Sequence, residues 1–388
     1  MEDMENLKER ANLLFAPPEL THPLTRLMND LKIVRQRQTY LSGFGVYSGD
    51  VAGLATLKEM YFAYGSGWNL AARQRRPDIS VYGSHEMVNL AREIKDAIAM
   101  TRHYVWEHSG GKKNLRSPLL IADVEAGFGD TQQTFNLVYK LFVENLAVVV
   151  HLENQHPFVK VCGHQLDYQI AGQHRREPKL LVSRKVWLKK LIAARMAAEL
   201  AARDANHPLS GLVLARSDSS DGVLEDGTPT NLQDAIDDII AAHEEAGAVI
   251  GWVEFNNCTL EDPLLVAEKV LVRCPQMLGL FINVSPNLYK NPHPLRSDIL
   301  AKAGYVGQFS TIPVNLIVQR AVLEFADEFK QEPFEAVLKL HERSRQLGVE
   351  KMEDGIFQGQ NWVGTNWWRR LKITIDECFD GKEPLIKK

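Results

Sequence analysis

The sequence is poor in cysteine, and no two of its cysteines lie at the short spacing that is typical of zinc or disulfide motifs. Four are present, Cys162, Cys258, Cys274 and Cys378. Their scatter excludes a disulfide framework and a structural zinc site of the usual spacing. We expect the last three to be small buried apolar side chains. Cys162 differs, because a lysine and a histidine lie two residues to either side of it.

Long apolar runs and a signal peptide are also missing. No run approaches the roughly 20 apolar residues that a helix needs to cross a bilayer. The first ten residues carry charges of both signs, whereas a signal peptide has a basic start and an apolar middle. We therefore expect a cytoplasmic protein with no membrane partner.

An excess of one charge sign is absent as well. Lys and Arg total 45 against 49 for Asp and Glu, and no basic stripe is interleaved with aromatic residues. This balance argues against a nucleic-acid partner. What the chain does have is 388 residues, of which 45% are hydrophobic. That is enough for a large core, in two domains or in one large barrel.

Short apolar or β-branched runs recur along the chain, each followed by a stretch with helical periodicity. Strands that alternate with helices pair in parallel through right-handed crossovers. Eight such units predict a closed (β/α)8 barrel of the TIM type. The predicted strands span residues 39–43, 79–82, 119–123, 147–152, 211–216, 249–254, 278–284 and 307–310. Helices are clearest over 186–204 and 232–246, where apolar residues recur on one face.

Three parts follow from this pattern. We expect an N-terminal helical arm over 1–38, the catalytic barrel over 39–331 and a C-terminal helical tail over 332–388. The polar stretch 165–183 is long enough to be a lid or a surface excursion. Tryptophans in a polar context of the tail indicate a subunit contact. They are Trp362, Trp367 and Trp368.

Polar residues gather at or near the predicted strands, and a barrel of this kind carries its chemistry at their carboxyl ends. They are Ser42, Asp78, Asp123, Glu125, His151, Glu153, Arg216, Glu254, Asn283, Ser285 and Thr311. Asp123 and Glu125 are two apart, so an extended backbone directs both the same way. Mg²⁺ usually takes one or two direct carboxylates and keeps several waters. We expect Asp123 as the direct ligand, with Glu125, Glu153 and Asp78 holding its waters. Salt bridges at the strand ends would give the same spacing.

The segment Lys160-Val-Cys-Gly-His164 places a thiol between two basic side chains. If it is extended, it turns Lys160, Cys162 and His164 to one face. Neighbouring positive charge lowers the pKa of a thiol below its usual ~8.5, and Gly163 allows the loop to close tightly. Cys162 is therefore a candidate proton donor or nucleophile, although a cysteine in a loop often has no function.

Other polar groups have a structural as well as a functional interpretation. His151 stands inside an apolar strand, where a hydrogen-bonded core histidine is the default. Arg216 can bind a substrate carboxylate through its planar fork, or it can pair with Asp218. Short neutral donors after two later strands suit carboxylate binding or loop capping. They are Asn283, Ser285, Asn287 and Thr311.

These motifs resemble the isocitrate lyase branch of the isocitrate lyase and phosphoenolpyruvate mutase superfamily. The resemblance runs from about Tyr40 to Thr311, and a weaker similarity is present around Gln360 to Gly364. Its most specific motifs are the Lys-x-Cys-Gly-His loop and the Asp-x-Glu-Ala-Gly-Phe-Gly run that begins at Asp123.

Matched by motif, the resemblance implies a role for each residue. Tyr40-Leu-Ser-Gly-Phe44 is similar to the family's Tyr-Leu-Ser-Gly-Trp, so Ser42 and Gly43 would bind the glyoxylate portion of the substrate. Asp78 matches the acid of Pro-Asp-x-Ser-x-Tyr, and Glu153 that of His-x-Glu-Asp. Substrate binding is further implied for Phe44, His151, Gly163, Arg216, Glu254, Asn283, Ser285, Asn287 and Thr311.

The implied reaction is the retro-aldol cleavage of a 2-hydroxy tricarboxylate, with isocitrate giving glyoxylate and succinate in the glyoxylate cycle. Mg²⁺, or Mn²⁺, would lower the pKa of the 2-hydroxyl and stabilise the forming carbonyl. Tyr40 is the expected base, and Cys162 would protonate the departing dicarboxylate with help from His164 and Lys160. The family also implies a homotetramer that exchanges C-terminal helices.

Departures from the family pattern leave other activities open. Val161 replaces a second basic residue of the loop, Phe44 replaces a tryptophan, Asn154 an aspartate and Asn287 a serine. The roomier Phe44 position favours methylisocitrate or another alkylmalate as substrate, or hydrolysis of an oxaloacetate-like compound. Such drift is also typical of a non-catalytic paralogue that binds a carboxylate or a partner.

Overall fold

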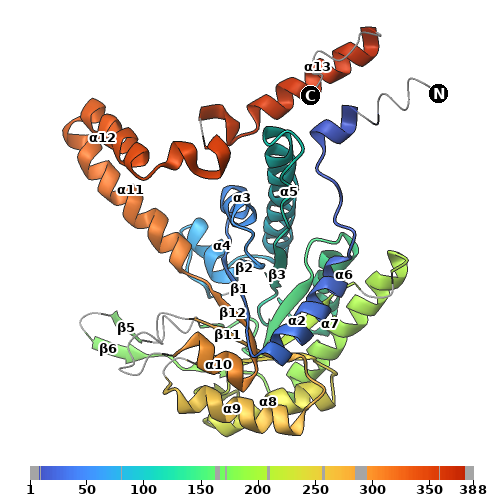
Figure 1. Ribbon diagram of the computed structural model, residues 1–388. Helices are drawn as coiled ribbons and strands as arrows, with labels where there is room; N and C mark the ends of the chain where they lie inside the picture. Colours follow the sequence, from blue (N-terminus) through green and yellow to red (C-terminus); the bar gives the residue numbers. More distant parts are fainter. Residues whose placement is uncertain are drawn as a thin grey trace.

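Eight parallel strands close into a barrel, which confirms the predicted (β/α)8 architecture (Figure 1). The computed structural model describes residues 8, 10–79, 81–161, 167–170, 173–207, 210–255, 258–284, 295–357 and 359–380. Around the barrel the strand order is β1-β12-β11-β10-β8-β4-β3-β2. These strands are β1 (Leu41–Gly45), β2 (Phe62–Gly65), β3 (Leu119–Asp123), β4 (Val149–Glu153), β8 (Leu212–Ser217), β10 (Ile250–Val253), β11 (Gly279–Asn283) and β12 (Tyr305–Ser310).

Helices follow most strands and surround the barrel (Figure 1). They are α2 (Pro23–Arg37), α3 (Gly49–Leu57), α4 (Gly67–Arg73), α5 (Ser84–His108), α6 (Thr131–Val143), α7 (Arg184–Asp204), α8 (Leu232–Glu244), α9 (Glu261–Arg273), α10 (Ser297–Ala303), α11 (Pro313–Gln331), α12 (Pro333–Gln346) and α13 (Thr365–Asp380). Side-chain caps begin several of them: Asp130 accepts hydrogen bonds from the first turn of α6, and Asn231 does the same for α8. The predicted helices 186–204 and 232–246 correspond to α7 and α8.

The apolar core has two layers. One fills the barrel interior with large side chains such as Phe62, Trp252 and Phe309, and the other lies between the strands and the surrounding helices. Helix α2 belongs to the inner layer, because its Leu24 and Leu27 are fully buried against the barrel residues. The packed interior fixes the strands rigidly, so the polar residues at their carboxyl ends are held in place.

The second strand lies elsewhere in the sequence than predicted. Residues 79, 81 and 82 lie outside any strand, before α5, and β2 is Phe62–Gly65 instead. The side chains of Ile79 and Val81 are exposed, whereas all four residues of β2 are buried. A four-residue strand is too short to show an alternating pattern, and its burial comes only from the strands on both sides.

The polar stretch 165–183 contains strands rather than only loop. The antiparallel pair β5 (Asp167–Ile170) and β6 (Gln173–Arg176) forms a hairpin, and β7 (Lys179–Leu181) pairs in parallel with β9 (Gly222–Leu224). The β7–β9 pairing joins segments about forty residues apart, which a local sequence pattern does not reveal.

The C-terminal segment leaves the barrel along α11 and then runs past the outer ends of α3 and α5 (Figure 1). After α11 and α12, two 3₁₀ helices (Val349–Gly355 and Gly359–Asn361) lead to α13. Trp367 is buried, and its indole N–H donates to the carbonyl of Leu14 over 2.8 Å, while the indole of Trp362 donates to Asp50. These two tryptophans therefore make contacts within the chain. Of the three cysteines expected in the core, Cys258 and Cys274 are buried, and Cys378 is exposed, contrary to expectation.

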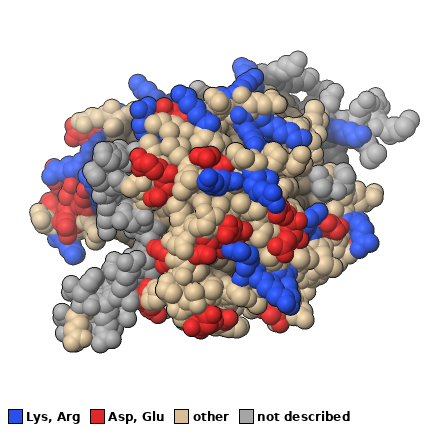
Figure 2. All heavy atoms as spheres, turned by 90° about the horizontal axis from the view of Figure 1, so that it is seen from below, with Lys and Arg blue, Asp and Glu red and all other residues tan. Residues whose placement is uncertain are grey.

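No helix in the described part of the chain is long and apolar enough to cross a membrane. On the face shown in Figure 2, acidic and basic side chains are interspersed. This mixture agrees with the near balance of the two charge signs in the sequence.

Candidate active site

A cavity at the carboxyl ends of the barrel strands brings together many of the predicted site residues. It is lined by Tyr64, Ser66, Trp68, Asp78, Asp123, Gln155, Lys160, Arg216, Trp252, Glu254, Asn283 and Thr311. Residues far apart in the sequence meet here because each comes from the end of a different strand or from the loop that follows it. Glu125, His151 and Glu153 are buried directly beside these lining residues.

Asp123, the last residue of β3, is held by four groups. Its Oδ2 accepts hydrogen bonds from the Tyr64 hydroxyl and the Gly67 amide, each over 3.0 Å. Its Oδ1 accepts from the Glu125 amide over 2.9 Å and lies 2.9 Å from His151 Nδ1. Burial by itself would raise the pKa of Asp123, but His151 and Lys160 lower it below the usual range. The carboxylate is therefore fixed in position and ionised.

Three further carboxylates surround the ammonium group of Lys160. Its Nζ lies 3.0 Å from Asp78 Oδ1 and 3.9 Å from Glu153 Oε1, and it is also paired with Glu125. Glu125 accepts a second hydrogen bond from the Tyr82 hydroxyl. Burial raises the pKa of Glu125 well above its usual range, and the neighbouring charges of Asp78 and Glu153 raise it further. These acids compete for too little positive charge.

The backbone at Glu125 is not extended, as the two-residue spacing had suggested. Its φ of 52° lies in the left-handed region, so the strand geometry ends at Asp123. The side chain consequently turns toward Lys160 and Tyr82. Gly67 makes room for it, because a Cβ there would lie 1.7 Å from Glu125 Oε1.

Arg216 joins the acidic cluster to a second ion pair. Its Nη1 lies 2.9 Å from Glu153 Oε2, its Nη2 donates to Asp218 Oδ1 over 2.8 Å, and its guanidinium stacks over the Trp252 ring. Lys179 donates to the same oxygen of Asp218 over 2.5 Å. Burial raises the pKa of Glu153 well above its usual range, although Arg216 opposes this. Arg216 thus pairs with Asp218, as the structural interpretation expected, and it also lines the cavity, where its binding of a substrate carboxylate stays a prediction.

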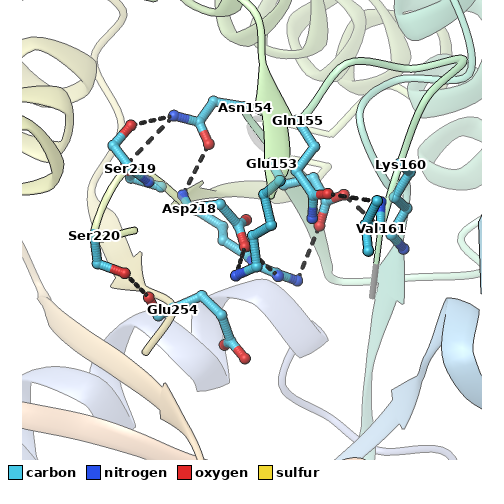
Figure 3. Close-up of polar contacts among 12 residues, drawn as sticks. Glu153, Asn154, Gln155, Lys160, Val161, Asp218, Ser219, Ser220 and Glu254 are labelled. Carbon is cyan, nitrogen blue, oxygen red and sulfur yellow. Dashed lines mark hydrogen bonds and ion pairs between the residues drawn. The ribbon is translucent and has the colours of Figure 1, made fainter. Parts of the chain in front are cut away.

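A buried network fixes the loop that carries Asp218. Figure 3 shows Asn154, next to Glu153, reaching Asp218 and Ser219. The Asn154 amide oxygen accepts from the Asp218 backbone N–H over 2.8 Å, and its nitrogen donates to Ser219 and Asp238. An amide serves this position because it must both accept and donate. The replacement of the family's aspartate by Asn154 therefore has a structural role.

The structure corrects the prediction for the segment Tyr40–Phe44. Tyr40 precedes β1, at the opposite end of that strand from the cavity, and is 41% exposed. Ser42 is exposed on β1, and Phe44 packs in the layer between strands and helices. Gly43 faces Phe62 within the barrel wall. None of these four residues lines the cavity.

The end of β2 supplies the residues that were assigned to β1. Tyr64, Ser66 and Trp68 line the cavity, and Gly67 donates to Asp123. Their sequence, Tyr64-Gly-Ser-Gly-Trp68, has the same Tyr-x-Ser-Gly-aromatic form as Tyr40-Leu-Ser-Gly-Phe44. It also keeps the tryptophan that the first copy lacks, so Phe44 gives no reason to expect a roomier pocket. The sequence signal was present, but the neighbouring copy matched it as well.

Several predicted residues lie outside the part of the chain that the structure describes. They are Cys162, Gly163, His164, Ser285 and Asn287. Their roles remain predictions. The remaining neutral donors, Asn283 and Thr311, are both buried at the cavity, with Thr311 Oγ1 3.4 Å from Asn283 Oδ1.

The acidic residues suit a hard divalent cation without forming a complete cage. Within the described residues, no group of three or more His, Cys, Asp or Glu side chains is arranged to hold a metal. Glu153 Oε1 and His151 Nε2 are buried without a hydrogen-bond partner, and Glu153 Oε2 has only its ion pair with Arg216. Mg²⁺ is usually held by one or two carboxylates together with waters and substrate oxygens. Asp123, and Glu153 through its Oε1, fit that mode of binding.

Comparison with known proteins finds similarity to one family. The family model described as "Isocitrate lyase family" matches residues 107–237. The isocitrate lyase of Halalkalibacterium halodurans is 25% identical over 366 residues, which cover 87% of this chain and 81% of that protein.

Solved structures agree in fold. An oxaloacetate acetylhydrolase in complex with the inhibitor 3,3-difluorooxalacetate has a TM-score of 0.60 at 19% identity, and the match covers 92% of this chain and 98% of the other. A 2,3-dimethylmalate lyase, a PEP mutase/isocitrate lyase superfamily member, has a TM-score of 0.59 at 19% identity, with 88% and 99% covered.

Fold and site together define a barrel enzyme with an acidic cavity at the carboxyl ends of its strands. With the sequence matches added, the chain is similar to the isocitrate lyase family, as a divergent relative, and these matches support an enzyme of the lyase type.

Proposed function

We propose that this enzyme cleaves a carbon–carbon bond of a 2-hydroxy tricarboxylate by a metal-dependent retro-aldol reaction, with isocitrate as the leading substrate and glyoxylate and succinate as products. One observation carries this proposal: Asp123, Lys160, Arg216 and Glu254 meet in one cavity with the neutral donors Asn283 and Thr311. Fixed charges of both signs around a cavity are what binding and activation of a polycarboxylate require.

Under this proposal Asp123 would hold Mg²⁺ or Mn²⁺, with Glu125, Glu153 and Asp78 binding its waters. Such an ion lowers the pKa of the substrate hydroxyl and stabilises the charge that develops on that oxygen. Arg216 and the neutral donors would orient the carboxylates, and Cys162 would protonate the dicarboxylate product, assisted by His164 and Lys160.

Tyr64 lies where Tyr40 was expected, but it acts as a proton donor rather than as the expected base. Its hydroxyl lies 3.0 Å from Asp123 Oδ2 and 3.3 Å from His151 Nδ1. Burial raises the pKa of Tyr64 well above its usual range, and Asp123 adds to this. Tyr64 therefore keeps its proton and donates a hydrogen bond to Asp123. We propose that it meets the substrate hydroxyl at the metal-binding end of the cavity.

A direct assay tests the function. Purified protein is incubated with Mg²⁺ and isocitrate, and glyoxylate is trapped as its phenylhydrazone and measured by absorbance. We expect release that depends on both protein and metal and that stops with a chelator. If neither isocitrate, methylisocitrate nor a related 2-hydroxy acid yields a 2-oxo acid, the chain has no such lyase activity.

A second candidate is a lyase for a smaller substrate, such as an alkylmalate, or an oxaloacetate-type hydrolase. The observation that favours it is Val161, which is buried where the family usually has a second basic residue. One cation fewer suits a substrate with one carboxylate fewer. Relative kcat/KM values for isocitrate, methylisocitrate, 2,3-dimethylmalate and oxaloacetate decide between the two, since kcat/KM measures discrimination between competing substrates.

We further propose that the enzyme is a homotetramer that exchanges C-terminal helices. Helix α11 extends away from the barrel to α12 (Figure 1), and apolar side chains on both helices are exposed. They include Ile317, Leu323, Phe334 and Leu338. Meanwhile Ser42 on β1 is exposed, although it lies on a strand of the barrel wall. A helix from a second copy would cover both surfaces.

Light scattering coupled to size-exclusion chromatography checks the assembly. We expect a mass near four chains for the natural protein and a smaller species for the double variant Ile317→Asp, Leu323→Asp, because buried charges disrupt an apolar interface. Val272→Asp, an exposed apolar residue on α9, is the matched control and should leave the mass unchanged. A natural protein that runs as a monomer would refute the exchange.

A further inference from the structure

Lys160 is a buried cation in the middle of the acids that were predicted to bind metal. It is 5% exposed, and its Nζ contacts Asp78, Glu125 and Glu153. Those three side chains are themselves nearly or fully buried. The ammonium therefore occupies the position that a positive ion among these acids would take.

The single positive charge of Lys160 does not balance the negative charges of the acids around it. Asp78, Asp123, Glu125 and Glu153 carry up to four negative charges. Within the described residues, the Lys and Arg side chains that pair with them are Lys160 and Arg216, and Arg216 is shared with Asp218. Buried carboxylates are costly unless paired.

Two buried side chains near the ammonium show the same shortage of partners. Glu153 Oε1 has no hydrogen-bond partner, Glu153 Oε2 has only its ion pair with Arg216, and His151 Nε2 has no hydrogen-bond partner either. His151 Nε2 lies 3.9 Å from Glu153 Oε2. A divalent cation brings twice the charge of an ammonium and can bind several oxygens at once. It would satisfy these acids better than Lys160 does.

We infer that Lys160 is a built-in substitute for the metal: its ammonium holds Asp78, Glu125 and Glu153 together in the metal-free protein, and a divalent cation displaces it. This inference rests on the proposed metal-dependent function. It gives Lys160 a positioning role before substrate arrives, in addition to the part proposed for it with Cys162. One consequence is that Lys160 stabilises the metal-free site but weakens metal binding, because the metal has to displace it.

Binding of Mn²⁺ to substrate-free protein, followed by the loss of the free Mn²⁺ signal in electron paramagnetic resonance, tests the exchange. We expect Lys160→Met to bind Mn²⁺ about tenfold more tightly than the natural protein, because no ammonium has to leave. Without metal the variant should melt at a lower temperature, and Mn²⁺ should raise its melting temperature more than that of the natural protein.

Lys179→Met is the matched control. Lys179 is also a fully buried lysine, but it pairs with Asp218 and not with the three acids around Lys160. Its Mn²⁺ affinity should equal that of the natural protein. Equal or weaker Mn²⁺ binding by Lys160→Met would overturn the exchange while leaving metal dependence intact. No Mn²⁺ binding by either the natural protein or Lys160→Met would remove the metal site itself.

A measurement on the natural protein covers the case in which Lys160→Met does not fold. Brief acetylation followed by mass spectrometry reports how accessible each lysine is. We expect the acetylation of Lys160 to increase several-fold when Mg²⁺ is added, whereas Lys179 stays protected. Unchanged protection of Lys160 at saturating Mg²⁺ would contradict its displacement.

Discussion

Replacing Asp123 with asparagine is expected to lower kcat/KM at least about a thousandfold, which corresponds to about 4 kcal/mol of lost transition-state stabilisation. The reason is that Asp123 is the proposed direct metal ligand and is held ionised by His151 and Lys160. An amide has neither the charge nor the second oxygen. Glyoxylate release under saturating Mg²⁺ measures the loss, and Mn²⁺ binding should fall in parallel.

Asp204→Asn is the control for this experiment. Asp204 is a carboxylate at the end of α7 that accepts a hydrogen bond from Tyr139 on the surface, so the same chemical change there should leave the rate unaltered. Near-ultraviolet circular dichroism of the Asp123 variant checks that the barrel is intact. A folded Asp123→Asn enzyme with the natural turnover would show that this carboxylate holds no essential metal.

Replacing Arg216 with methionine is expected to lower the free energy of unfolding by about 3–5 kcal/mol, which is typical when one partner of a buried ion pair is removed. The change leaves Glu153 and Asp218 buried without their shared arginine. It also removes the guanidinium from the Trp252 ring, which it approaches within 4.5 Å. Urea unfolding in a chelating buffer measures the difference.

Arg184→Met provides the comparison for an ion pair at the surface. Arg184 lies 2.6 Å from Asp238, but its side chain is 40% exposed, and Asp238 keeps hydrogen bonds from Ser217, Ser219 and Asn154. Exposed pairs contribute about 0–1 kcal/mol. If the Arg216 variant lost no more stability than the Arg184 variant, Glu153 and Asp218 would have to be satisfied by other groups.

The loss of stability in the Arg216→Met variant should also depend on pH in a definite direction. Burial raises the pKa of Glu153 in the folded protein, and Arg216 opposes that rise. Without the arginine, the folded state holds the proton to a higher pH than the unfolded chain does. The stability of the variant then falls as pH rises above the pKa that Glu153 has in the unfolded chain. The variant's loss of stability relative to the natural protein should therefore be smaller at about pH 5 than at about pH 8.

The positions of candidate site residues were predictable where a short segment shows both the residue type and its spacing. Asp123 ends the five-residue strand β3 after four apolar residues, with no shift from the predicted boundary, and Arg216 follows a similar apolar run in β8. Such strands are buried on both faces, so a continuous apolar run followed by a charged residue marks the carboxyl end of a parallel strand.

The prediction failed where two segments carried the same motif. The same Tyr-x-Ser-Gly-aromatic motif occurs at Tyr40-Leu-Ser-Gly-Phe44 and at Tyr64-Gly-Ser-Gly-Trp68. Only the second segment stands at the carboxyl end of its strand. The first begins before β1, so its Tyr40 lies at the other end of the barrel. Residues 62–65 are recognisable as a strand only once β1 and β3 lie on both sides.

By itself the sequence determined the alternation of strands and helices, the identity of the acids and the family to which their motifs point, because these depend on local periodicity and residue type. Only the tertiary structure decided which serine and tyrosine face the cavity, that Asn154 supports Asp218, and that Lys160 sits among the acids. Such contacts join residues from separate strands and loops. Their distances follow from how the barrel closes, which no local pattern encodes.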